Sequence, residues 1–479
     1  MMQEDARTCR RFMPRSGRRL HLKVSSVPPS RLGIGVLLVI AAVHLTAVLL
    51  SHPAPAYLAP RFTLMIALAF LGFLLMATMS ISLLTTSLVI VPTLQLGTVR
   101  AAGIEINPTF LFGAALSVGL LVRLFSEQTV PRRAWTSTST ISLWTIIAAT
   151  VAVVLSSIAN GQSLSNSMPW FVATSVALAL ILSARRGYLR PSAIPVALLT
   201  GFALTATSDL RSYLRGTVVD TGVNAGRFVG GLGDYELLGE YYAVAIVIAL
   251  ATLIHGHRLA VSVLAIYVIG LGLILLFATH SRSPVILLAL ACPLLLVAPA
   301  VGRTASRPRL VLTIAGAASL GMVLAPLISS SNTFARVLST VDRGDFVATI
   351  NRSSVWPIVI SDPKFLSAGL FGNGPVGVYE WFGVWPHNLA LWTVWSLGIM
   401  GCIFVALLAA TGISGIVRWR KNGWLTVTLG FSLIVLFADQ LVVEFPREGS
   451  MVLFVLALCA LVGATSIAER SESLGHTAV

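Results

Sequence analysis

Apolar runs of about 20 residues recur from one end of the chain to the other, and they constrain its fold more than any other feature. Hydrophobic residues make up 56% of the sequence and charged residues only 11%, whereas a soluble domain carries about 25% charged residues. In hydrocarbon, every backbone N–H and C=O group must be paired within the protein, so continuous apolar runs must form helices. The sequence therefore predicts an all-α, polytopic membrane protein.

The runs predict a helical bundle of about 12 to 14 transmembrane helices. Two boundaries are ambiguous, because residues 62–95 read as one tilted helix or a tight hairpin, and a similar break falls near residue 282. With a hairpin in both places the predicted spans are 32–50, 62–79, 81–95, 108–124, 138–159, 169–183, 192–208, 236–254, 259–279, 283–300, 309–328, 387–416, 423–443 and 450–467.

The basic residues decide between these readings. With a cytoplasmic N-terminus and both hairpins, most of the 33 lysine and arginine residues fall in cytoplasmic segments, as the positive-inside rule requires. A single span at 62–95 would place the later basic clusters outside. The hairpin reading is therefore preferred, with both termini in the cytoplasm.

This topology divides the chain into five regions. They are a basic cytoplasmic N-terminus (1–31), transmembrane helices (32–328), a large extracytoplasmic loop (329–386), further transmembrane helices (387–467) and a cytoplasmic C-terminus (468–479). The first run, 32–50, is longer than the apolar core of a signal peptide, and a poor cleavage site follows it. We interpret it as a retained first helix.

The composition also narrows the partners. A net charge of +15 suggests an anionic partner, but the clusters lie between apolar runs, where topology accounts for them, so nucleic acid is not expected. The four cysteines are Cys9 in the basic N-terminus and three others within apolar runs, with no CxxC spacing. Neither a disulfide framework nor a zinc site is predicted, and no cofactor is expected.

The first polar element on the predicted outer face is a glycine-rich loop that begins at Arg227 and enters a helix through Asp234 and Glu236. Glycines let a backbone turn sharply or approach a ligand. We favour a structural interpretation of the two acids, in which Asp234 caps the helix and Glu236 complements its dipole. No local structural role accounts for Arg227. The first turns of the helix continue with Glu240, Tyr241 and Tyr242.

The second element is Ser281-Arg282 at the junction of two apolar runs. An arginine at a helix centre in the membrane costs roughly 2.5–3.5 kcal/mol on insertion scales, so ionisable residues there are functional candidates. The alternative is an arginine whose side chain extends to the interface and only marks the boundary.

The third element is the large outer loop, which contains Arg352 near Trp356, a Gly372-Asn373-Gly374 stretch, and His387-Asn388 at the entry to the next run. The glycines do not form a nucleotide fingerprint, because no strand precedes them. Pro386 fixes the position of His387, which favours a functional role for this histidine. Asp439 and Gln440, followed by Glu444 and Arg447, are interpreted as part of an ion pair at the outer edge.

In this order, the three elements resemble the O-antigen ligase and O-antigen polymerase superfamily of bacterial envelope glycosyltransferases. The resemblance covers residues 225–415, and the helix count extends it over most of the chain. The sequence departs from the family pattern in two places. After Ser281-Arg282, the family usually has glycine or alanine, whereas this chain has Ser283, followed by Pro284. Asp234, Tyr235 and Glu236 also replace an asparagine that commonly follows the first arginine.

The resemblance implies a polyprenyl diphosphate-linked glycan donor and a metal-independent, inverting displacement. Arginines are suited to a diphosphate leaving group because they stay protonated and bind two oxygens at once. Arg227, Arg282 and Arg352 would form this clamp. His387 would take the proton of the attacking hydroxyl, with Glu236 and Glu240 as alternative bases.

Binding roles are expected for the residues around this centre. The candidates for substrate binding are Glu236, Glu240, Tyr241, Trp356 and Asn388. Stacking on sugar rings is a candidate role for the aromatic side chains Tyr241, Tyr242, Trp356, Trp381 and Trp385. The competing interpretation of the aromatic side chains is an aromatic belt at the membrane interface.

The acceptor would be a glycan, a lipid or a polysaccharide at the outer leaflet of a bacterial plasma membrane, with membrane lipid and other proteins of polysaccharide assembly as partners. The alternative is a transporter or exporter of a lipid-linked or anionic solute. Its arginines would line the substrate path. Ionisable groups gather on one face and are nearly missing from the helix middles, which argues against a midplane transport site. A structural scaffold would leave Arg282 without a role.

Overall fold

The computed structural model describes residues 79–95, 99–101, 104–126, 133–162, 167–216, 226–255, 258–301, 355–375, 377–382, 386–417, 423–440 and 445–476. All of them belong to the unit Ala54–Val479. The predicted spans 32–50, 62–79 and 309–328 lie outside the described residues, as do Arg352 and Trp385.

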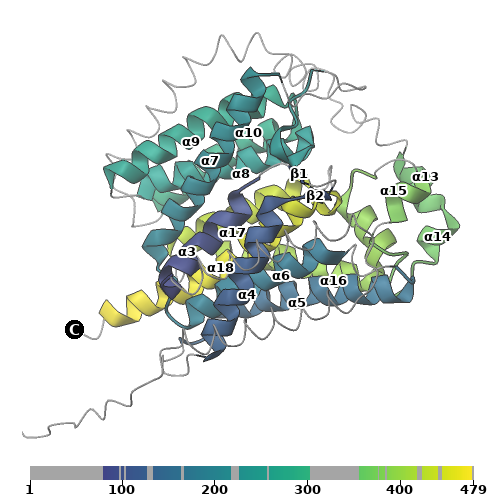
Figure 1. Cartoon of the computed structure of the whole chain (residues 1–479), viewed down its shortest axis with the longest axis horizontal. Helices are drawn as coiled ribbons and strands as arrows, with labels where there is room; N and C mark the ends of the chain where they lie inside the picture. Colours follow the sequence, from purple (N-terminus) through teal and green to yellow (C-terminus); the bar gives the residue numbers. More distant parts are fainter. Residues whose placement is uncertain are drawn as a thin grey trace, which may run out of the picture. The chain divides into compact units, whose positions relative to one another are not determined.

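Among the described residues, eight helices are long and apolar enough to cross a membrane. They are α4 (Pro108–Ser126), α5 (Ser137–Ala159), α6 (Met168–Arg185), α7 (Ile194–Leu214, preceded by η3, Pro191–Ala193), α8 (Tyr235–His255), α9 (Leu259–Ala278), α16 (Leu389–Val417) and α18 (Gly449–His476). Three further apolar helices are α3 (Ile81–Ile90, extended by η1, Val91–Thr93), α10 (Ser283–Val301) and α17 (Trp424–Asp439). The chain is a polytopic helical membrane protein (Figure 1).

Each predicted span that falls within the described ranges coincides with one of these helices, so the predicted all-α fold class is confirmed. The break between α9 and α10 lies where the second hairpin was predicted, and Ser80 caps α3 by accepting from the Leu83 N–H at 3.2 Å. The last helix, α18, continues to His476, past the predicted boundary at 467.

Short elements connect the long helices. A two-stranded antiparallel hairpin, β1 (Val99–Ala101) and β2 (Ile104–Ile106), precedes α4. We call the described part of the large loop the lobe. It contains α13 (Val355–Ser361), α14 (Pro363–Leu366) and α15 (Gly377–Phe382) (Figure 1). Two 3-10 turns, η4 (Gly230–Leu232) and η5 (Phe445–Arg447), precede α8 and α18.

Helices α8 and α18 form the core of the bundle, because nearly every described side chain along their membrane spans is buried. A helix that is apolar on all sides belongs inside a bundle. Small residues and hydroxyls allow the close packing: Gly412 of α16 meets Gly430 of α17, and Thr145 of α5 bonds Thr411 at 2.9 Å. Such contacts hold helices together where the hydrophobic effect gives no preference.

Backbone contacts sort the helix termini into two ends. At the end we call the site end, the Phe228 N–H donates to Ala278 O at 3.1 Å and the Leu389 N–H to Gln440 O at 2.8 Å. At the opposite end, the Arg133 N–H donates to Arg185 O at 2.7 Å, and Glu469 accepts from the first turn of α17. This grouping agrees with the predicted alternation of the spans. The assignment of the site end to the outer face remains a prediction.

Candidate functional site

The first turn of α8 is the centre of the candidate site. The Asp234 carboxylate accepts hydrogen bonds from the Glu236 N–H at 2.8 Å and the Leu237 N–H at 3.0 Å, so it caps the helix as predicted. The cap fixes the direction in which the first turn enters the bundle. Glu236 and Glu240 then lie one turn apart, and both are buried.

His387 lies against Glu236, with 3.5 Å between Nδ1 of the imidazole and Oε2 of the carboxylate. The Glu236 side chain is only 8% exposed, whereas that of His387 is 26% exposed. A carboxylate beside one ring nitrogen restricts the orientation of the imidazole. The imidazole is therefore the more accessible member of the pair.

The backbone around His387 holds this orientation. His387 has a φ of +49°, and among the described residues only His280, at +53°, is another non-glycine residue with positive φ. Such a conformation is uncommon and is held by its surroundings. Asn388 caps α16 by accepting from the Leu391 N–H at 3.1 Å. Asn388 is therefore positioned by a structural bond and lies next to the imidazole along the chain.

The Arg227 loop is attached to the same turn of α8. The Arg227 guanidinium lies over the Tyr235 ring, 4.3 Å from its centroid. The next residue, Phe228, bonds the last residue of α9, Ala278, four positions before Arg282. The loop thus joins the α8 start to the α9–α10 turn.

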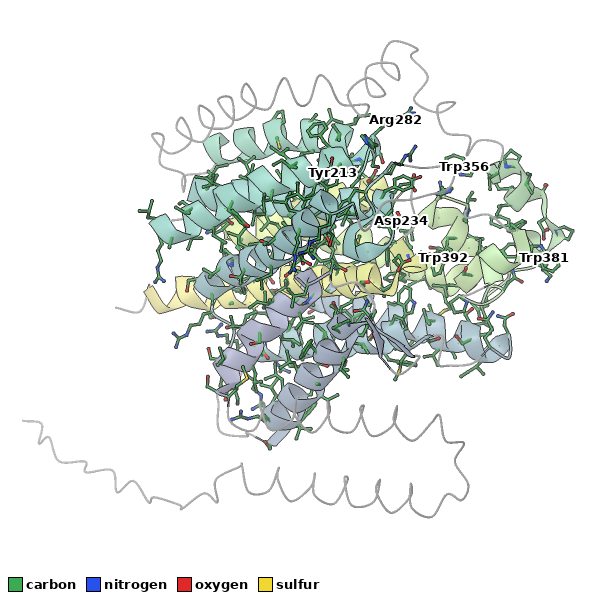
Figure 2. All side chains as sticks on the ribbon, turned by 45° about the horizontal axis from the view of Figure 1, so that its top comes forward. Tyr213, Asp234, Arg282, Trp356, Trp381 and Trp392 are labelled. Atoms are coloured by element: carbon green, nitrogen blue, oxygen red, sulfur yellow. The ribbon has the colours of Figure 1, made fainter. Side chains whose placement is uncertain are left out.

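The α9–α10 turn packs tightly against α8 and carries Arg282. A Cβ atom at Gly239 would lie 3.0 Å from Pro284 and 3.3 Å from Ser281, so a side chain here would require these neighbours to shift by a few tenths of an ångström. Figure 2 shows Arg282 and Asp234 at the same end of the molecule. Three predicted residues, Arg227, Arg282 and His387, therefore belong to segments that are bonded to or packed on the first turns of α8.

Asp209 supports the glycine loop and was not recognised in the sequence. Its carboxylate, buried near the end of α7, accepts from the Gly231 N–H at 3.1 Å and the Tyr242 hydroxyl at 2.7 Å. A Cβ at Gly230, whose φ is +53°, would collide with Asp209 and Leu238. The glycines here serve backbone packing on a buried acid. Position near the end of an apolar run was the only available signal for Asp209.

Tyr241 is not brought to this cluster. It is fully buried, packs against Phe202 and Phe454, and donates its hydroxyl to Thr93 O at 2.5 Å. Its role in the structure is core packing between α8, α7 and α18. The adjacent Tyr242 is equally buried.

Trp356 belongs to the lobe and reaches the site through a structural bond. Its indole N–H donates to Pro386 O at 2.9 Å, directly before His387. Figure 2 labels Trp356 at this end of the molecule. The indole therefore fixes the chain that presents the histidine. Its half-buried ring remains partly accessible.

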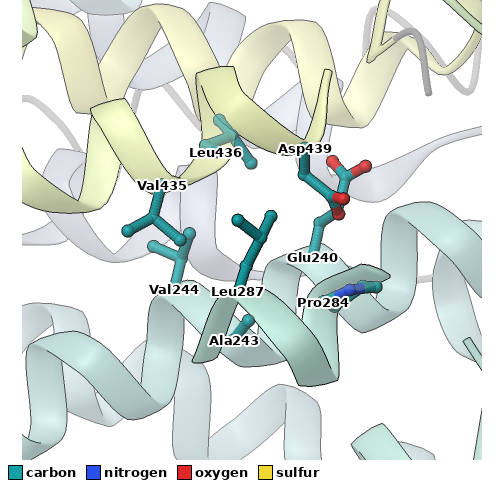
Figure 3. Close-up of a pocket in the computed structure, with 8 residues that line it drawn as sticks. All are labelled: Glu240, Ala243, Val244, Pro284, Leu287, Val435, Leu436 and Asp439. Carbon is teal, nitrogen blue, oxygen red and sulfur yellow. The ribbon is translucent and has the colours of Figure 1, made fainter. Parts of the chain in front are cut away.

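A second polar layer lies deeper, between α8, α10 and α17. Glu240 and Asp439 line a narrow gap with Pro284 and Leu287 (Figure 3). The Gln440 side-chain amide donates to the Glu240 carboxylate, and its carbonyl accepts from the Phe445 N–H. The ion pair predicted around Asp439 stays a prediction, because Glu444 and the Arg447 side chain lie outside the described residues.

Gln440 also connects this layer to His387. Its backbone carbonyl accepts from the Leu389 N–H at 2.8 Å, two residues beyond the histidine. The residue therefore bridges α8, α17 and the start of α16. A lone glutamine at the end of an apolar run carries no sequence pattern that would reveal this bridge.

The Gly372-Asn373-Gly374 stretch has a structural role in the lobe. Helix α16 is interrupted at Gly398 (φ +62°, ψ −149°). There, Trp395 O and Ser396 O accept from the N–H groups of Asn373 and Gly374 at 2.7 and 3.0 Å. In return, the Ile399 and Met400 N–H groups donate to Gly369 O and Leu370 O.

This interlock, formed by residues 369–374 and the break at Gly398, satisfies backbone groups that a kink inside a membrane helix would expose. A Cβ at Gly372 would lie 2.4 Å from Ser396 C, and one at Gly398 would lie 2.5 Å from Gly369 O. The predicted span at 387–416 is therefore two helical segments joined at Gly398. The glycine motif is accounted for by packing alone.

Acidic residues and histidines do not gather into a metal-binding set in the part of the chain that the structure describes, where no three His, Cys, Asp or Glu side chains converge. The polar groups that do meet are one imidazole, one carboxylate and the segments that carry two guanidinium groups. Arg352 lies outside the described residues.

A comparison of the chain with models of protein families finds no match. A comparison with curated proteins also finds none.

Proposed function

We propose that the protein is a glycosyltransferase of the outer membrane face that uses a polyprenyl diphosphate-linked glycan and polymerises it or transfers it to a surface polysaccharide. The observation that carries the proposal is the His387–Glu236 pair, in which the two side chains lie 3.5 Å apart. Glu236 belongs to the first turn of α8, and the Arg227 loop and the α9–α10 turn with Arg282 contact the same part of α8. A candidate base and two candidate phosphate ligands therefore belong to one end of the bundle.

The reaction requires three groups. With Nδ1 directed at Glu236, Nε2 of His387 is left to accept the proton of the acceptor hydroxyl. The hydroxyl oxygen forms a bond to the anomeric carbon while the bond to the diphosphate oxygen breaks, which inverts the configuration. The polyprenyl diphosphate leaves as an anion, and Arg227 and Arg282 offset its charge by charge-assisted hydrogen bonds.

Burial supports this division of roles. Glu236 is shielded from solvent and borders the imidazole, which is the arrangement of a carboxylate that orients a base. Glu240 is buried one turn deeper and bonds Gln440, so it is the weaker candidate for direct proton transfer. Arg352 completes the proposed clamp by resemblance alone.

The second candidate function is transport of a lipid-linked or anionic solute. The observation that favours it is the pair of carboxylates, Glu240 and Asp439, that lines the gap between three membrane helices (Figure 3). Ionisable groups at such positions mark ion paths in transporters.

One experiment separates the two functions. Purified protein in nanodiscs is incubated with a polyprenyl diphosphate oligosaccharide, and free polyprenyl diphosphate and longer glycans are measured by mass spectrometry. The proposal predicts that both products appear together. Solute movement in proteoliposomes without cleavage of the donor would contradict it and favour transport.

A further inference from the structure

The lobe exposes apolar side chains although it lies outside every predicted membrane span. Ile358 is 59% exposed, Ile360 46%, Leu370 48% and Trp381 51%. In α13 only Val359 is fully buried, even though six of its seven residues are apolar. A surface of this kind on a small lobe marks a contact with lipid or with another molecule.

The interlock with α16 sets the level of this surface relative to the bilayer. Beyond Gly398, residues 399–417 span roughly 28 Å at 1.5 Å per residue, which matches the hydrocarbon core. Their exposed side chains include Ile399, Ile403 and Ile413, which a membrane-spanning segment would present to lipid. Leu370 accepts through its carbonyl from Met400, so it adjoins the upper edge of this lipid-facing surface.

Lys364 and Trp381 form a pair suited to the headgroup region. The Lys364 ammonium lies 3.1 Å from the centroid of the Trp381 ring, and the indole N–H donates to Asp362 at 3.1 Å. Tryptophan is enriched at membrane interfaces, and lysine extends its charge toward the water. The ammonium covers one face of the indole, which leaves less of the ring for stacking on a sugar.

The lobe is joined to the interlock at Lys364 as well. The Asn373 side-chain amide donates to Lys364 O at 3.0 Å and to Trp395 O at 3.3 Å. Lys364 therefore lies close to the level at which the membrane span of α16 begins. The positive charge and the exposed indole are thus at the expected depth of the lipid phosphates.

We propose that the lobe rests on the lipid bilayer through exposed apolar side chains that include Ile360, Leu370 and Trp381, with the Lys364 ammonium, which lies over the Trp381 ring, at the level of the lipid phosphates. The partner is the membrane interface itself, continuous with the lipid-facing surface of α16. This inference does not depend on the proposed transferase activity. Since Trp356 of the same lobe bonds Pro386, the contact would also hold the His387 segment close to the membrane surface.

The test measures the depth of spin labels in nanodiscs that contain anionic lipid. Single cysteines replace Ile360, Leu370 or Trp381 in a protein from which Cys9, Cys292 and Cys402 are removed, and Cys459 is kept because it is fully buried. Power saturation compares oxygen, which partitions into lipid, with a water-soluble nickel chelate. Ile403→Cys is the lipid-facing control and Arg215→Cys, exposed at the end of α7, is the aqueous control.

The proposal predicts an oxygen-to-nickel accessibility ratio at Leu370→Cys and Ile360→Cys several-fold above that at Arg215→Cys and close to that at Ile403→Cys, with Trp381→Cys in between. Ratios equal to the aqueous control at all three positions would overturn it. So would labels that are inaccessible to both reagents, since this result indicates a protein contact at the lobe.

Discussion

The α8 entrance and the lobe carry the same kind of sequence, a glycine-rich stretch with polar residues beside an apolar run, yet the structure uses them differently. At α8, the glycine loop packs on the buried acid Asp209, and ionisable side chains gather around the first turn of the helix. In the lobe, Gly372, Gly374 and Gly398 place backbone against backbone. The first region groups ionisable side chains, and the second satisfies the backbone hydrogen bonds of an interrupted helix.

The difference teaches that glycine content alone does not identify a ligand site at a membrane edge. What distinguishes the two regions is the fate of the charged groups. Around α8, an acid and a histidine meet at 3.5 Å, whereas the bonds of the interlock join backbone N–H and C=O groups together with the Asn373 amide. Substitutions in the two regions should therefore have effects of different kinds.

The largest effect is expected from Arg282→Ala, which removes a proposed ligand of the leaving group. Loss of one preorganised donor to a developing anion lowers turnover by about 10²–10³-fold, or roughly 3–4 kcal/mol. Turnover of the lipid-linked glycan measures this loss, and thermal melting of the same samples separates it from unfolding. Arg258→Ala, an exposed arginine that precedes α9 at the opposite end, is the matched control and should retain activity.

Gly372→Ala tests the interlock. The new Cβ would lie 2.4 Å from the backbone of Ser396, at a φ of +69°, so overpacking and strain should destabilise the protein by roughly 2–4 kcal/mol. Melting of the detergent-solubilised protein measures this. Gly161→Ala shares a positive φ but meets nothing within 4 Å, and should cost less. Equal melting of the two variants would contradict the interlock.

Gln440→Leu tests whether Gln440 positions the His387 segment, since Gln440 is proposed to act through its bonds to other residues and not by contact with a ligand. Loss of the Gln440 side-chain bonds to Glu240 and to the Phe445 N–H should cost about 1–3 kcal/mol. We expect turnover at saturating donor to fall while the KM for the donor stays nearly constant. Gln95→Leu is the control, since the side chain of Gln95 bonds only to nearby Pro92. An unchanged turnover in Gln440→Leu would exclude a positioning role.

The smallest effect is expected at the helix cap. Asp234→Ala removes the acceptor for two backbone N–H groups and should cost about 1 kcal/mol of stability. Asp234→Asn preserves a capping oxygen and should melt close to the unmodified protein. If the asparagine variant loses activity while keeping its stability, the carboxylate takes part in chemistry beyond the cap.

Much of the fold is predictable from the sequence, because apolar length and basic residues between runs determine helices and their alternation. The break at Gly398 is not, since residues 387–416 form one apolar run and the compensating carbonyls come from residues 369–370. A kink of this kind depends on a partner that the local sequence does not contain.

The candidate site is predictable in part. Arg227, Arg282 and His387 stand out because charged or titratable groups at a membrane boundary need a reason. Asp209 and Gln440 do not stand out, since their importance comes from bonds to Gly231, Tyr242 and Glu240. The position of Tyr241 in the sequence suggests a side chain at the membrane interface, but the ring packs in the core. The hydroxyl can be buried there because it donates a hydrogen bond to Thr93 O.

The most direct test of the proposed site is turnover of a polyprenyl diphosphate oligosaccharide by the unmodified protein, His387→Ala and His255→Ala in the same nanodiscs. His255 stacks on Trp424 at the opposite end of the bundle. His255→Ala therefore controls for the loss of a half-buried histidine away from the site. The proposal predicts full activity in His255→Ala and a loss of about 10²–10⁴-fold in His387→Ala, the contribution of a positioned base. Equal release of polyprenyl diphosphate by all three proteins would contradict it.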